Sequence, residues 1–172
     1  MHTKVFDSLV KKGIVTNEPF YITAELIQRF MEEYINLSGT NGNTKKNTNT
    51  MYSRKLAALS FIKFKQENKL PISEGFVYCI SNPAWKNQYK IGMSQNPKER
   101  LAQYQTYSPY RDYKLEHWSF WFDKRKGEKL IHQYFKDLKE HEWFSINSRD
   151  LSKYLERINS SSDLYGSLAL IG

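Results

Sequence analysis

The spacing of apolar residues changes at about Pro71, and this change constrains the fold more than any other feature of the sequence. Before Pro71, apolar side chains recur every three or four residues, as in amphipathic helices. After it, short runs rich in aromatic and β-branched residues alternate with helical stretches. A chain of 172 residues is long enough for one or two small domains. We therefore expect a small helical unit over residues 1–70, followed by an α+β domain over residues 71–158.

Three helices are predicted in the first unit. Residues 23–38 carry apolar side chains at helical spacing, and Thr23 is placed to act as the N-cap. Further helices are expected near residues 3–12 and from Met51 to about Gln66. Between the helix at 23–38 and the one that begins at Met51, residues 39–50 contain four Asn, four Thr, two Gly and two Lys, with no apolar or acidic side chain. This stretch is expected to be a mobile loop.

The second unit is predicted to have the order ββαβα, with one more helix after it. In chain order we expect strands at 75–80 and 89–92, a helix at 97–107, a strand at 115–122 and helices at 126–138 and 147–158. Residues 159–172 are expected to form a C-terminal tail, which is either a docking segment or a frayed terminus.

The charge of the chain favours nucleic acid as a partner. Lys and Arg number 26 against 18 Asp and Glu, which gives a net charge of +8 and a pI near 9.4. Excess positive charge favours polyanions through long-range attraction and counterion release. DNA is therefore the expected partner. Basic residues on the helix that begins at Met51, including Lys65, could contact phosphates or simply be solvated, and for any single lysine the solvated interpretation is favoured.

Cysteine usage and hydropathy indicate the compartment. Cys79 is the only cysteine, which excludes an internal disulfide and a zinc site built from several cysteines, and which suits a reducing cytoplasm. No stretch approaches the ~20 apolar residues of a membrane span, and the N-terminal residues lack the apolar run of a signal peptide. We expect no membrane partner and a cytoplasmic location.

Several short motifs fall on the predicted α+β domain. The first strand carries Phe76-Val77-Tyr78 and the second carries Lys90-Ile91-Gly92. Arg100 and Tyr104 lie four residues apart, which places their side chains on one helix face. A later helix carries Glu128-x-x-x-His132, and Glu142-Trp143-Phe144 follows it.

Over residues 74–146 these motifs resemble those of the GIY-YIG nuclease superfamily. The positions of Arg100 and Tyr104 after Gly92 are similar to those in the excision-repair incision nucleases of this superfamily. The Lys-Ile-Gly motif, in place of Tyr-Ile-Gly, is similar to the branch found in phages and large DNA viruses. The resemblance implies a three-stranded antiparallel sheet flanked by helices, and a metal-dependent DNA endonuclease that hydrolyses phosphodiester bonds.

The chemistry of phosphodiester hydrolysis explains why these residue types occur together. The reaction needs an activated water, neutralisation of charge on the phosphate oxygens and help for the leaving 3′-oxygen. Glu128 is a hard oxygen ligand able to hold one Mg²⁺, for which Mn²⁺ is expected to substitute. Arg100 can hold the scissile phosphate. By resemblance, Tyr78 orients or deprotonates the water.

The roles of the remaining candidate residues have more than one interpretation. A tyrosine with a pKa near 10 is a poor base at neutral pH, so either Lys90 and the metal lower the pKa of Tyr78, or a neutral Lys90 acts itself. His132 could orient phosphate, donate a proton to the leaving group or simply pack. Glu142 could bind metal or support the structure, and structure is favoured. Gly92 is expected to allow a close backbone approach.

The favoured function is a Mg²⁺-dependent DNA endonuclease with a single-metal site, in which the helical unit assists DNA engagement or assembly. Many members of the superfamily carry an asparagine after the metal-binding helix, where this chain has Glu142-Trp143-Phe144. A non-catalytic nucleic-acid-binding module is therefore the alternative, and a host-directed protein acting through its aromatic surface is a third. Intact Tyr78, Arg100 and Glu128 favour the enzyme, because a cleft that only binds DNA needs no carboxylate facing the phosphates.

Overall fold

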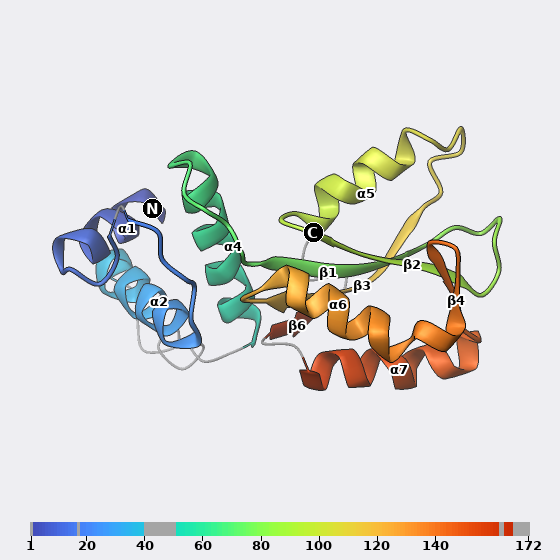
Figure 1. Ribbon diagram of the computed structural model, residues 1–172. Coiled ribbons are helices and arrows are strands. Elements are labelled where there is room, and N and C mark those ends of the chain that lie inside the picture. Colours follow the sequence, from blue (N-terminus) through green and yellow to red (C-terminus); the bar gives the residue numbers. More distant parts are fainter. Residues whose placement is uncertain (1, 17, 40–50, 162–163, 167–172) are drawn as a thin grey trace. The chain divides into compact units, whose positions relative to one another are not determined.

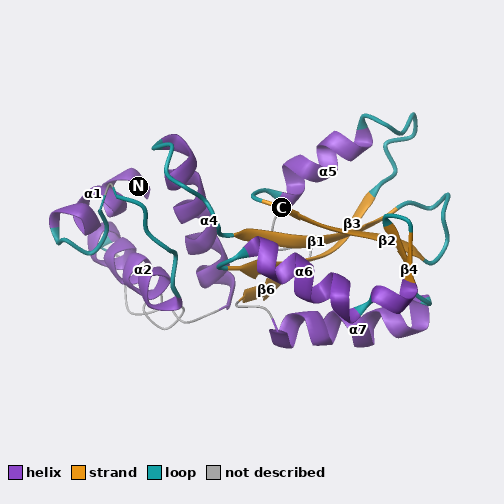
Figure 2. Ribbon diagram, in the orientation of Figure 1, coloured by secondary structure: helices purple, strands orange, loops and turns teal. Residues whose placement is uncertain are grey.

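The computed structural model describes residues 2–16, 18–39, 51–161 and 164–166. The chain divides into two compact units, Met1–Glu74 and Gly75–Gly172 (Figures 1 and 2). Apart from Gly39, the predicted mobile loop at 39–50 lies outside the described residues.

The first unit is helical, as predicted. It consists of α1 (His2–Lys11), α2 (Ala24–Ser38) and α4 (Met51–Glu67). Thr23 caps α2, because its Oγ1 accepts a hydrogen bond of 3.1 Å from the backbone N–H of Leu26. The helices meet around the Phe6 ring, whose centroid lies within about 5 Å of three other phenylalanine rings, those of Phe30, Phe61 and Phe64. An aromatic core therefore holds the three helices together.

A buried ion pair joins α4 to the last residue of the first unit. The ammonium of Lys65 lies 2.8 Å and 2.9 Å from the two carboxylate oxygens of Glu74, and the two side chains are only 1% and 0% exposed. Glu74 also accepts a hydrogen bond of 2.9 Å from the backbone N–H of Ile22, and Lys65 donates one to the carbonyl of Phe20. Lys65 therefore fixes α4 to the segment before α2 and is not available for phosphate contacts.

The second unit is built on an antiparallel sheet. Its centre is the predicted group of three strands, β1 (Gly75–Ser81), β2 (Gln88–Ser94) and β3 (Lys114–Trp121), with β1 between the other two. The structure adds β4 (Lys139–Glu140) and β5 (Trp143–Ser145) beside β2, and β6 (Leu164–Gly166) beside β3. The α+β class is thus confirmed, and the expected three-stranded sheet is the middle of a six-stranded one in the order β4-β5-β2-β1-β3-β6.

Helices cover both faces of this sheet (Figure 1). Helix α5 (Pro97–Gln105) begins at the N-cap Asn96 and lies on one face. Helices α6 (Lys124–Tyr134) and α7 (Ser148–Ser161) lie on the other. There they enclose a core that includes Val77 and Cys79 of β1, Ile91 of β2, Ile131 of α6, Phe135 directly after α6, and Ile158 of α7.

Element ends differ from the prediction in the last third of the chain. The helix expected to reach residue 138 ends at Tyr134, and a 3₁₀ turn at Lys136–Leu138 leads into β4. Helix α7 continues to Ser161, and residues 164–166 pair with β3, so part of the expected tail belongs to the sheet. Residues 167–172 lie outside the description. No helix among the described residues is long and apolar enough to cross a membrane.

Replacing Lys65 by Met should lower the free energy of unfolding of the first unit by about 3–5 kcal/mol, because the carboxylate of Glu74 stays buried without its cation. Lys63→Met is the matched control, since Lys63 and Glu67 form an exposed pair at 3.9 Å on the same helix. That control should change the free energy by less than about 1 kcal/mol. Urea denaturation measures both, and equal effects would contradict the structural role of Lys65.

Candidate functional site

Tyr78 and Gly92 form the first part of the site. They lie directly opposite each other on β1 and β2, so both face the same side of the sheet. A Cβ atom added to Gly92 would lie 2.5 Å from the Tyr78 hydroxyl oxygen and 2.7 Å from its Cζ. The phenol ring therefore crosses the backbone of Gly92. The close approach expected at Gly92 exists, and the group that makes it is the Tyr78 side chain.

Arg100 and Tyr104 approach this phenol from α5. The Nε of Arg100 donates a long hydrogen bond of 3.4 Å to the Tyr78 hydroxyl. The guanidinium carbon of Arg100 lies 5.4 Å from the centre of the Tyr104 ring. Its Nη1 donates to the side-chain oxygen of Gln103 at 2.8 Å. The one-face placement of Arg100 and Tyr104 is confirmed, and the structure brings Tyr78, Arg100 and Tyr104 together.

The pKa of Tyr78 moves away from the value that a base requires. Burial of the phenol, which disfavours the charged form, raises its pKa from 10.0 to about 12, although the hydrogen bond from Arg100 acts in the opposite direction. Tyr78 is therefore a neutral phenol at physiological pH. Lys90 is not among the side chains that act on this pKa, so the interpretation in which Lys90 and the metal lower it stays a prediction.

Lys90 has a different partner. Its ammonium lies 2.9 Å from the carboxylate of Glu142, in the turn between β4 and β5. The hydrogen bond from Lys90 and its positive charge lower the pKa of Glu142. Glu142 thus supports the structure by fixing the β4–β5 turn to β2, which is the favoured of its two interpretations.

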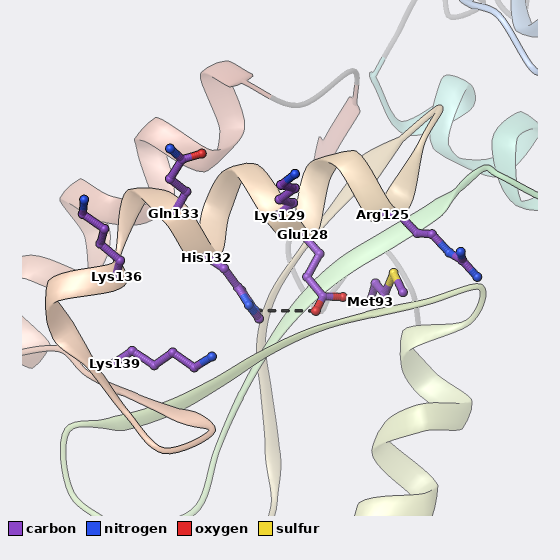
Figure 3. A pocket seen from close by; sticks show the side chains of 8 residues that line it. All are labelled: Met93, Arg125, Glu128, Lys129, His132, Gln133, Lys136 and Lys139. Carbon is purple, nitrogen blue, oxygen red and sulfur yellow. Dashed lines mark ion pairs between the residues drawn. The ribbon is translucent and has the colours of Figure 1, made fainter.

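Glu128 and His132 lie in a pocket of about 640 Å³ between α6, Met93 and the start of β4 (Figure 3). The Nε2 atom of His132 is 3.8 Å from a carboxylate oxygen of Glu128, and each side chain is about one-quarter exposed. His132 Nε2 is also 2.8 Å from the carbonyl oxygen of Ile91. Since a carbonyl only accepts, Nε2 carries the proton in this contact and His132 is held against β2.

The same pocket is lined by four cationic side chains, Arg125, Lys129, Lys136 and Lys139. The sequence motifs assigned none of them to the site. Arg125 and Lys129 lie four residues apart on α6, so they share a helix face with Glu128 and His132, whereas Lys136 lies in the 3₁₀ turn and Lys139 in β4. The spacing of Arg125 and Lys129 is the signal from which these two could have been found. Figure 3 shows Lys139 extended toward His132 and Glu128, Arg125 on the opposite side of Glu128, and Lys129 and Lys136 pointing away from the carboxylate.

Glu128 offers a single carboxylate, which is the kind of ligand that suits a Mg²⁺ ion whose other ligands are water and substrate oxygens. Mg²⁺ is commonly held by one or two carboxylates together with phosphate oxygens, and it keeps several waters. Glu128 offers one partly exposed carboxylate in an open pocket with room for those waters. Among the described residues, no cluster of three or more His, Cys, Asp or Glu forms a closed cage. The residues present therefore fit a single, weakly chelated Mg²⁺.

The candidate residues form two groups, one around Tyr78 and one around Glu128, and these contact the neighbouring β2 positions 92 and 93. Tyr78 crosses Gly92 on the α5 face, whereas Met93 faces the pocket of Glu128 on the other. Within the described strands, β5 pairs with β2 only at Gln88 and Tyr89. The part of β2 beyond Tyr89 therefore lies between the two groups, with one group on each face of the sheet.

Comparison with known proteins gives one family. Residues 75–159 match the family model described as T5orf172 domain. The match runs from the start of β1 into α7 and includes all the candidate residues, from Tyr78 to His132. No curated protein and no solved structure matches the chain.

The raised pKa of Tyr78 predicts a loss of stability at high pH. Between pH 10 and 12 the unfolded chain loses the phenol proton while the folded protein keeps it, so the free energy of unfolding falls by roughly 2 kcal/mol over this range. Tyr78→Phe should remove this part of the slope, whereas Tyr107→Phe, at an exposed tyrosine, should leave it. Urea denaturation at several pH values measures the slope. Identical slopes for both variants would refute the buried phenol.

Proposed function

We propose that the second unit is a Mg²⁺-dependent DNA endonuclease of the GIY-YIG type, from the branch found in phages and large DNA viruses. The observation that carries this proposal is the pocket in which one carboxylate, Glu128, lies among four Lys and Arg side chains. The T5orf172 match supports it in coarser form, as a nuclease-related, phage-type module that engages DNA.

The pocket combines two requirements that DNA hydrolysis makes of a protein. Its cations neutralise backbone phosphates, which supplies affinity without regard to sequence. Its carboxylate would by itself repel those phosphates, so a surface selected only for DNA binding gains nothing from it. A bound divalent cation reverses this repulsion. The pairing of basic side chains with one carboxylate therefore favours metal-assisted chemistry over binding alone.

In this proposal Glu128 holds the Mg²⁺, which when bound lowers the pKa of a water and neutralises charge on the phosphate oxygens. Arg100 places its fixed positive charge beside the Tyr78 hydroxyl and binds the scissile phosphate. Tyr78, as a neutral phenol, donates or accepts a hydrogen bond that orients the attacking water and does not remove its proton. Tyr104 holds the Arg100 guanidinium in place.

His132 and Lys90 act as positioning residues. His132 bonds the Ile91 carbonyl and so holds α6 against β2 with the Glu128 carboxylate in the pocket. Lys90 pairs with Glu142 at 2.9 Å and so holds the β4–β5 turn beside β2. The helical unit of residues 1–74 assists DNA engagement or assembly in this proposal.

A non-catalytic nucleic-acid-binding module is the second candidate. Two observations favour it. Burial raises the pKa of Tyr78 to about 12, so Tyr78 is a poor general base, and Lys90 forms an ion pair with Glu142. The two candidates differ in one measurable respect. A binding module would hold DNA in a salt-dependent way and never cut supercoiled plasmid, with either Mg²⁺ or Mn²⁺ present.

Glu128→Gln should abolish Mg²⁺-dependent plasmid cleavage, because the amide cannot replace the anionic ligand. Binding of duplex DNA in EDTA should be retained or modestly strengthened, since a negative charge leaves a basic pocket. Glu156→Gln, on the exposed side of α7, is the matched control and should cut as the wild type does. Gel assays of cleavage and binding measure both properties. Undiminished cleavage by Glu128→Gln would remove Glu128 from the site.

A further inference from the structure

Four aromatic side chains form a continuous row across the second unit, which we call the aromatic row: Tyr104, Tyr113, Trp85 and Trp143. Consecutive ring centroids are 5.5, 6.3 and 5.5 Å apart. The residues come from α5, the segment before β3, the β1–β2 connection and β5. Segments far apart in the sequence thus converge to build it.

Trp85 is the exposed ring of the aromatic row, and the other three rings are partly buried. The side chain of Trp85 is 49% exposed, whereas Trp118 and Trp121 of the sheet are buried. The rings of the row are tilted by 50–59° to one another, so none lies flat against the next. Trp85 therefore has free surface against which a flat ligand can stack.

Positive charge accompanies the row. Lys86 follows Trp85 directly and is exposed. At the other end, the guanidinium of Arg100 lies over Tyr104, which belongs both to the row and to the candidate site. A ligand that combines flat aromatic groups with negative charge complements this surface, and it would continue directly from the site.

We propose that the aromatic row binds unpaired bases of single-stranded or locally opened DNA next to the site of cleavage. This inference rests on the proposed function and adds the class of substrate. Every base has a π face that stacks on aromatic side chains, and the charged backbone can follow the basic residues beside them. In an intact duplex the base faces are covered by their neighbours, so the row distinguishes opened DNA from a regular duplex.

A packing role and a protein-docking role for the row predict different behaviour. If the rings only pack the loops together, their truncation lowers stability and weakens binding of every DNA form alike. If the row docks a partner protein through apolar contact, an aliphatic side chain of similar size replaces Trp85 without effect on DNA. Comparison of Trp85→Phe with Trp85→Leu distinguishes base stacking from the packing role and from the protein-docking role. Phe keeps a π face, whereas Leu keeps only apolar surface.

The test uses the full-length protein in EDTA, so that no cleavage occurs. A thymidine oligonucleotide of about 20 residues should quench tryptophan fluorescence, because a stacked base contacts Trp85. Trp85→Leu should weaken binding of this oligonucleotide by about fivefold or more, with Trp85→Phe close to wild type and duplex affinity unchanged in both. Tyr134→Leu, at a 44% exposed ring of α6 outside the row, is the matched control and should bind as wild type.

The proposal is overturned if the oligonucleotide binds wild type without quenching, if Trp85→Leu and Trp85→Phe bind it equally, or if duplex affinity falls in parallel. The quenching measurement needs only the wild type, so the test stands even where a variant fails to fold. The proposed endonuclease function is tested by a different experiment, and it is contradicted if the wild-type protein does not cleave DNA in the presence of Mg²⁺. Stacking without cleavage, and cleavage without stacking, are thus distinct results.

Discussion

The contact between the Tyr78 ring and Gly92 sets the geometry on which the rest of the candidate site depends. It fixes the pairing of β1 with β2, since any side chain at position 92 would collide with the phenol. A shift of this pairing by one residue would turn every side chain of β2 to the other face of the sheet. A side chain would then lie opposite Tyr78 in place of Gly92, and Met93 would leave the pocket of Glu128.

A second glycine acts in the same way on α6. A Cβ atom on Gly127 would lie 2.4 Å from the indole of Trp121, so the absence of a side chain lets α6 pack closely on β3. Glu128 is the next residue, and its position over β2 follows from this packing together with the His132 bond to Ile91. The buried sheet residues thus control where the more exposed side chains of the candidate site lie.

Local patterns in the sequence were sufficient to predict the central strands, the helices and the pairing of Arg100 with Tyr104, because each depends on periodicity or i,i+4 spacing. The β4–β5 pair and β6 contain only two or three residues each, which is too short for a periodic signal. The bond between Lys90 and Glu142 joins residues 52 positions apart, and no local pattern encodes it. For the same reason a lysine on a helical stretch, Lys65, looked exposed although its carboxylate partner buries it.

The central claim is that Glu128 holds one divalent cation at the edge of β2. Titration of ¹⁵N-labelled protein with Mn²⁺, followed by paramagnetic broadening of amide signals, tests this claim without any need for activity. We expect broadening centred on Glu128 and the neighbouring pocket residues Met93 and His132, and we expect it to be lost in Glu128→Gln. Broadening centred elsewhere, or unchanged in that variant, would contradict it.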